Sequence, residues 1–216
     1  MRAQLFGLLV STVSVAALGG QSPPPSDVHP QSLSRLPPLQ RSELNDDGKR
    51  IWDYVAGSGR AMPLTGPGPV SMYSPKVAEP MHTLNQYLRT SVIGNRFFEL
   101  SALIAAREFD QQYEWSGHEP AALRAGLEQS TIDVVKFNKD VTTLAEKDAT
   151  VIRFGRALFR DHKVSPALWT KTVDLFGRQG AFEITAVMGD YAMAAIMLTA
   201  VDQQLPQERK ALLPPR

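Results

Sequence analysis

The sequence predicts an all-α domain, a helical bundle of about seven or eight helices with an internal pseudo-repeat. From residue 42 onward, apolar residues recur at the three- and four-residue spacing of a helix with one buried face. No segment alternates between apolar and polar residues for long enough to favour a strand. One eight-residue motif also occurs twice, 84 residues apart, which indicates two related helical halves.

The chain begins with the layout of a secretory signal. Arg2 is followed by an apolar run from Leu5 to Leu18 and by small residues that fit a cleavage site. The run is shorter than the roughly 20 residues of a membrane span, although an uncleaved anchor is the alternative. We therefore expect residues 1–20 to be a signal peptide, and the protein to be secreted or periplasmic without a membrane anchor after cleavage.

Composition divides the remainder and excludes some functions. Residues 21–41 are rich in proline and predict an extended arm, residues 42–205 predict the helical domain, and residues 206–216 a C-terminal tail. The formal net charge of +1 falls to zero without Arg2, so the chain lacks the basic footprint of a nucleic-acid partner. The sequence contains no cysteine, which excludes mechanisms that use a thiol.

Local signals set several helix boundaries. Ser74-Pro75 and Ser165-Pro166 each combine an N-cap residue with a first-turn proline. The apolar periodicity that runs from about residue 95 stops at Gly126, as it does before a glycine C-cap. The segment "QGAFEITAVMGDYAMAAIMLTAV" is apolar on almost every side and predicts a buried helix.

The repeated motif acts as an internal control for function. Residues 98–105 (FELSALIA) and 182–189 (FEITAVMG) match in kind at each position and share a glutamate, Glu99 or Glu183. At 12, 15 and 19 residues after Glu99, the chain has Gln111, Glu114 and His118. At the same distances after Glu183 it has Ala195, Leu198 and Asp202. Packing alone would preserve the polar groups in both copies, so the first copy is the candidate site.

Spacing predicts how this polar set can come together. Gln111, Glu114 and His118 lie at i, i+3 and i+7, so a helix places them on one face. Glu99 cannot join them on one straight rod, because nineteen residues would separate it from His118 by about 28 Å. A reversal just before Asp110, which would cap the next helix, brings Glu99 and His118 to similar heights on neighbouring helices.

The segment "ELSALIAAREFDQQYEWSGHEPAALRAGL" resembles the carboxymuconolactone decarboxylase family, within the wider alkylhydroperoxidase D-like superfamily. "SPKVAEPMHTLNQYLR" before it and "FGRQGAFEITAVMGDYAMAAIML" after it are also similar, so the resemblance covers about residues 43–205. The peroxidase branch of the superfamily has Glu, the two thiols of Cys-x-x-Cys, and His at this spacing. Gln111 and Glu114 stand at the thiol positions here, so the resemblance is to the cysteine-less branch.

The resemblance implies a lyase that decarboxylates a small carboxylated lactone or a related acid without a cofactor, and a homo-oligomer, either a trimer or a hexamer. We assign Glu114 as the proton donor and His118 as the group that orients it. Glu99 would raise one of the two carboxyl pKa values by like-charge repulsion. The candidate substrate contacts are Gln111, Arg107, Arg96 and Trp115, with an arginine pairing with the substrate carboxylate.

Four other interpretations stay open at this point. Glu99 could be structural and tied to Arg96 three residues earlier, in a non-catalytic helical module whose polar groups only satisfy a core. Two glutamates and His118 could hold a divalent metal, although the chain has neither Glu-x-x-His nor His-Glu-x-x-His. The scaffold could also host a different lyase or isomerase reaction, or a peroxidase-like activity.

Overall fold

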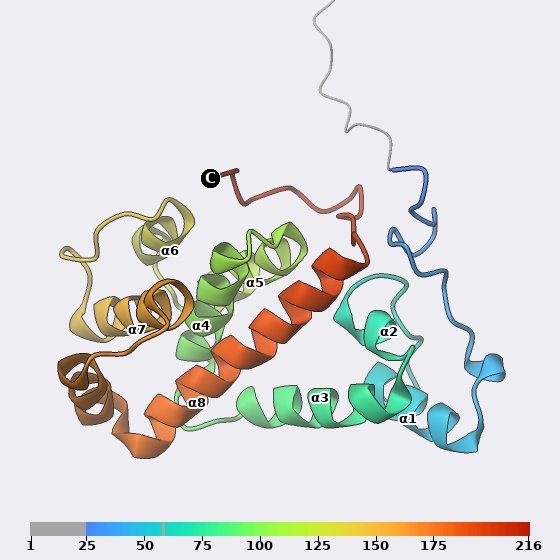
Figure 1. Cartoon of the computed structure of the whole chain (residues 1–216), viewed down its shortest axis with the longest axis horizontal. Coiled ribbons are helices and arrows are strands. Elements are labelled where there is room, and N and C mark those ends of the chain that lie inside the picture. The colour runs from blue at the N-terminus through green and yellow to red at the C-terminus, as the bar shows by residue number, and fades with distance from the viewer. Residues whose placement is uncertain (1–24, 58) are drawn as a thin grey trace, which may run out of the picture.

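The computed structural model describes residues 25–57 and 59–216, so the predicted signal peptide lies outside the described residues. The predicted all-α fold is confirmed, since the described part of the chain contains eight α-helices and no β-strand (Figure 1). The helices are α1 (Asp46–Ala56), α2 (Pro67–Ser71), α3 (Pro75–Leu88), α4 (Gly94–Glu108), α5 (Gln112–Arg124), α6 (Gln129–Lys136), α7 (Glu146–Arg156) and α8 (Pro166–Ala200). A 3₁₀ turn at 41–43 and a π-helical turn at 157–161 complete the elements.

Helix α4 lies at the centre of the main core and packs against α5, α6, α7 and α8. Its residues from Phe98 to Arg107 are all buried, which explains why this helix is apolar nearly all round. The second copy of the repeated motif lies on α8, and α4 and α8 pack directly against each other. A smaller apolar cluster around Ile51, Met72 and Ala78 joins α1, α2 and α3 at the other end of the molecule.

Helix α8 crosses the molecule diagonally in Figure 1 and covers α4. It begins at the predicted cap, where the Ser165 side chain accepts a hydrogen bond from the Leu168 amide, and it kinks at Gly177. By length and composition it could span a membrane, but 56% of its most apolar window is buried within the domain. The prediction of a fully buried helix is wrong for one stripe, because Phe182 and Ile196 are exposed.

The chain reverses direction between α4 and α5, as the spacing predicted. The turn is a Schellman motif, in which the Asp110 amide donates to the Arg107 carbonyl and the Gln111 amide donates to the Ala106 carbonyl. Asp110 has a left-handed φ of 50°, a conformation that Asp tolerates better than most residues. Our assignment of Asp110 as the N-cap is therefore wrong, and the Gln111 side chain caps α5 by accepting from the Tyr113 amide.

The segments on either side of the helical domain pack against it. In the proline-rich arm, the Arg35 amide donates to the Val201 carbonyl, and the Gln204 amide donates to Leu33. The C-terminal residues 203–216, which we call the strap, run from the end of α8 back across α5 (Figure 1). Leu213 of the strap is buried in the main core, so these residues are part of the folded domain rather than a separate tail.

Candidate active site

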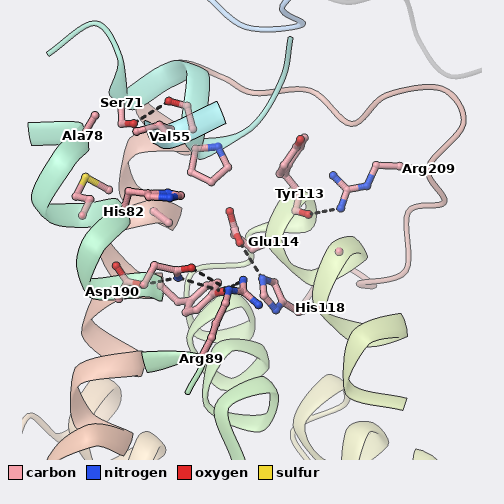
Figure 2. Close-up of a pocket in the computed structure, with 17 residues that line it drawn as sticks. Val55, Ser71, Ala78, His82, Arg89, Tyr113, Glu114, His118, Asp190 and Arg209 are labelled. Atoms are coloured by element: carbon pink, nitrogen blue, oxygen red, sulfur yellow. Dashed lines mark hydrogen bonds and ion pairs between the residues drawn. The ribbon is translucent and has the colours of Figure 1, made fainter. Parts of the chain in front are cut away.

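A cavity of about 350 Å³ lies between α2, α3, α5, α8 and the strap (Figure 2). Its wall on the α2 side is apolar and includes Val55, Pro67 and Ala78. The opposite wall carries ionisable side chains, including Glu114 and His118 of the predicted site. An apolar cavity with a few convergent polar groups is the usual form of a site for a small molecule.

Glu99, His118 and Glu114 form a chain of three ionisable groups. His118 Nδ1 lies 2.7 Å from Glu99 Oε2, and His118 Nε2 lies 3.5 Å from Glu114 Oε2. The reversal before α5 produces this arrangement, because Glu99 comes from α4 and the other two residues come from α5. The three side chains are almost completely buried, so their interactions are weakly screened by solvent.

Of the three ionisable groups, Glu114 and His118 line the cavity (Figure 2), whereas Glu99 lies behind His118. The Oε1 atom of Glu114 is buried and has no hydrogen-bond partner among the residues that the structure describes. A buried polar atom without a partner is costly, and such atoms in native structures call for an explanation. Glu114 therefore lines the cavity with a carboxylate whose Oε2 lies close to His118 and whose Oε1 has no partner among the described residues.

The two carboxylates control the charge of His118. Burial by itself lowers the pKa of the imidazole, but hydrogen bonding and charge from Glu114 and Glu99 outweigh burial and raise it to about 9. At neutral pH His118 is therefore an imidazolium, with Nδ1–H donated to Glu99 and Nε2–H directed towards Glu114. The arrangement holds a mobile proton next to the cavity.

A second polar layer from α3 and α8 fixes the floor of the site. Arg89 donates to Asn85 Oδ1 and to the Tyr191 hydroxyl, and its Nη1 lies 3.9 Å from Glu99 Oε1. The Asn85 amide in turn donates to Asp190 Oδ2 at 2.8 Å. Burial raises the pKa of the Asp190 carboxyl, although the Asn85 hydrogen bond opposes that change. The ring of Tyr191 packs edge-on against His118, with centroids 4.6 Å apart.

The sequence analysis missed His82, Asn85 and Arg89, which line the cavity from α3. The signal was present, because these residues have the same i, i+3, i+7 spacing as the set on α5. His82 packs edge-on against Tyr54, and burial, followed by the charge of Arg89, lowers the pKa of its imidazole.

The four predicted substrate contacts lie elsewhere. The Gln111 amide group donates to the Thr199 hydroxyl and is not part of the cavity wall. Trp115 is fully buried, and its indole N–H donates to Glu119. Counted from Gln111, Glu114 and Trp115 are at i+3 and i+4, but the structure brings only Glu114 of these three residues to the cavity wall.

The two predicted arginines, Arg96 and Arg107, also lie outside the cavity wall. Arg96 forms a bidentate ion pair with the buried Asp148, which removes it both from the cavity and from the suggested pairing with Glu99. Arg107 is buried and donates to the Pro214 carbonyl of the strap. The arginines that do line the cavity are Arg89 and Arg209.

The metal alternative has no geometric basis among the described residues. Within 25–57 and 59–216, no three His, Asp or Glu side chains are placed to hold one ion. Glu99 and Glu114 approach opposite nitrogens of His118, so the imidazole separates the two carboxylates.

Comparison with solved structures identifies the fold. A peroxidase-related protein from Ralstonia eutropha, described as an alkylhydroperoxidase AhpD core, is 16% identical with a TM-score of 0.65, covering 84% of this chain and 95% of that one. A protein of unknown function from Agrobacterium tumefaciens, linked by its description to AhpD and antioxidant defence, is 16% identical with a TM-score of 0.58, covering 64% and 96%. The debrominase Bmp8 bound to 2,3,4-tribromopyrrole has the same identity and TM-score, covering 79% and 91%.

No family model and no curated protein sequence matches the chain. The structural likeness extends over nearly the whole length of each neighbour, while the identity is low. The protein therefore has the alkylhydroperoxidase D-like fold. This confirms the fold that the resemblance implied. Membership of the superfamily and of its decarboxylase branch is a matter of proposal.

Proposed function

We propose that the protein is a decarboxylase-like lyase, in which general acid–base groups of the chain itself remove carbon dioxide from a small carboxylated lactone or a related acid. The observation that carries the proposal is the carboxylate of Glu114, which lines the cavity and is backed by His118 and Glu99. Its buried Oε1 has no hydrogen-bond partner among the described residues. A cavity of about 350 Å³ is of the size that small ligands occupy.

The chemistry of decarboxylation matches what these groups can do. When carbon dioxide leaves, the bond between the carboxylate carbon and its neighbour breaks, and the electron pair stays on the substrate as an enolate. One proton must then be added to carbon. The Nε2–H proton of His118 passes to Glu114 Oε2, and the resulting carboxylic acid protonates the substrate carbon. Glu99 keeps the imidazole oriented through Nδ1, and solvent later restores the proton.

The positive charge of His118 has a second use in this reaction. The raised pKa keeps the imidazolium charged while negative charge develops on the substrate. A preorganised charge in a buried site stabilises a developing anion more than the same charge does in water.

Two of the structural neighbours are described as peroxidase-related and as a debrominase. This chain contains no cysteine, so a route that needs a protein thiol is not open to it. Acid–base chemistry uses the groups that the cavity does have. For that reason we favour the lyase over a peroxidase-like activity.

The proposal is tested by incubating the protein with a panel of carboxylated lactones and unsaturated acids and measuring released carbon dioxide. Glu114→Gln should reduce kcat by about 10²- to 10⁴-fold, the usual contribution of one acid–base group. Glu183→Gln is the control, because it changes another buried glutamate to glutamine outside the cavity. Rearrangement of a substrate without loss of carbon dioxide would instead identify an isomerase. No turnover of any panel member, combined with strong destabilisation by Glu114→Gln, would identify a structural cluster.

A further inference from the structure

The strap brings one more cation to the cavity. It is attached at its start by Gln203, whose amide N donates to the Leu33 carbonyl and whose oxygen accepts from Gly66. At its far end, Gln112 of α5 bonds the Leu213 backbone in both directions, at 2.9 Å each. Between these attachments, Arg209 of the strap lines the cavity.

Arg209 is held in a defined place without a carboxylate partner. Its guanidinium stacks over the Tyr113 ring at 4.4 Å, and its one hydrogen bond, to the Tyr113 carbonyl, is long at 3.4 Å. Among the described residues it forms no ion pair, whereas the second cavity arginine, Arg89, has Glu99, Asn85 and Tyr191 around it. A guanidinium has five N–H donors in a planar fork, so most of those of Arg209 remain available (Figure 2).

The surface of α5 is shaped to receive this guanidinium. Gly117 lies beneath it, and a Cβ at that position would come within 2.6 Å of Arg209 Nη2. Glycine in the middle of a helix weakens that helix relative to alanine. The missing methyl group therefore has a local use here, which is to let the guanidinium lie flat between the α5 backbone and the Tyr113 ring.

We propose that Arg209 is the substrate anchor, binding a carboxylate that the substrate keeps throughout the reaction, with Gly117 and Tyr113 as its seat. This inference rests on the proposed function in taking the bound anion to be the substrate. Planar bidentate pairing is the preferred geometry between a guanidinium and a carboxylate. The site thus combines an anion anchor on the strap with the proton source on α5.

The anchored carboxylate is distinct from the one that leaves. A cation that grips the leaving carboxylate stabilises the ground state, and that contact is lost as neutral carbon dioxide forms, so it would slow the reaction. A cation on a retained carboxylate binds the ground state and the transition state equally and serves to position the substrate. The substrate class that fits is therefore a small acid with two carboxylates, one next to Glu114 and one on the strap.

Binding of maleate, succinate and benzoate to the full chain tests the anchor independently of turnover. Isothermal titration at constant ionic strength is carried out on the unaltered protein, on Arg209→Gln and on Gly117→Ala. Lys210→Gln is the matched control, because it removes the same charge from the neighbouring, exposed position. Losing a charge-assisted pair should weaken carboxylate binding roughly 10- to 100-fold in Arg209→Gln. Gly117→Ala should also weaken it while leaving the thermal stability equal or higher, and Lys210→Gln should leave it within about twofold.

Equal carboxylate binding by Arg209→Gln and the unaltered chain overturns the proposal, as does absence of binding of all three anions to the unaltered chain. The anchor and the lyase proposal fail separately. Carboxylate binding that depends on Arg209, without carbon dioxide release from any acid, supports the anchor and removes the lyase. Turnover that depends on Glu114 but not on Arg209 supports the lyase proposal and overturns the anchor.

Discussion

Glu99 and Glu183 occupy the same position in two copies of one motif, yet their carboxylates have different partners. Glu99 accepts from the His118 ring, whereas Glu183 accepts from the Tyr87 hydroxyl and the Val92 amide. Both side chains are buried, so burial alone does not distinguish them. The partners differ because α5, the helix that follows α4, places His118 next to Glu99.

The first prediction uses this pair. Glu99→Gln removes the carboxylate nearest to His118 Nδ1, so the pKa of His118 should fall by about 1 to 3 units, the size of effect that one close opposite charge has. Glu183→Gln should leave that pKa within a few tenths of a unit. Histidine ring resonances followed by NMR from pH 5 to 10 measure both variants. A pKa that does not move in Glu99→Gln would show that the carboxylate is not coupled to the imidazole.

The second prediction concerns stability and pH. The pKa of His118 in the folded protein, about 9, lies above the ordinary histidine value of 6.5, so folding favours the protonated ring. Its contribution to the free energy of unfolding is therefore complete below pH 6.5 and is lost as the pH rises through 9. Since one pKa unit corresponds to about 1.4 kcal/mol, the change over this window is on the order of 3 kcal/mol. The unfolding free energies of the parent protein and of His118→Gln, measured in urea, should approach each other as the pH rises towards 9.5. A difference in unfolding free energy that does not change with pH would contradict the raised pKa of His118.

The third prediction concerns the ion pair between Arg96 and Asp148. Asp148 is buried with only 2% of its side chain exposed, and Arg96 binds both of its oxygens. Arg96→Met leaves that carboxylate without its charged partner, which should cost about 3 to 5 kcal/mol of unfolding free energy. The same change should not alter the His118 titration, because Arg96 lies outside the cavity. A shift of the His118 pKa in Arg96→Met without loss of stability would indicate that Arg96 does interact with the site.

The arrangement of Glu99, Glu114 and His118 could be predicted from sequence because it depends on local rules. Helical periodicity places residues at i, i+3 and i+7 on one face, and the length of a straight helix requires a break between Glu99 and His118. The identity of the turn residue could not be fixed in this way. Asp serves both as an N-cap and as a residue with positive φ, and the choice was made by the Schellman hydrogen bonds before Gln111.

The positions of the arginines could not be predicted from the sequence, for a different reason. Whether an arginine faces a cavity or a buried carboxylate depends on partners far away in sequence, such as Asp148 for Arg96 and Pro214 for Arg107. No local pattern encodes those partners. The same holds for Arg209, which the sequence placed in a tail beyond the domain, because only the docking of Leu213 in the core brings the strap over the cavity.

The fourth prediction concerns association between copies of the chain, which the family resemblance implies. Phe182 and Ile196 lie along one exposed stripe of α8, 70% and 55% exposed, and Val92 next to Glu183 is 64% exposed. Large apolar side chains grouped on one face mark interaction surfaces more often than single ones do. Phe182→Asp should therefore shift the protein from an oligomer towards the monomer, as measured by light scattering after size-exclusion chromatography. Phe137→Asp, at an exposed phenylalanine beyond the end of α6, is the control and should leave the mass unchanged. A monomeric parent protein, or an equal effect of both changes, would contradict an interface on this stripe.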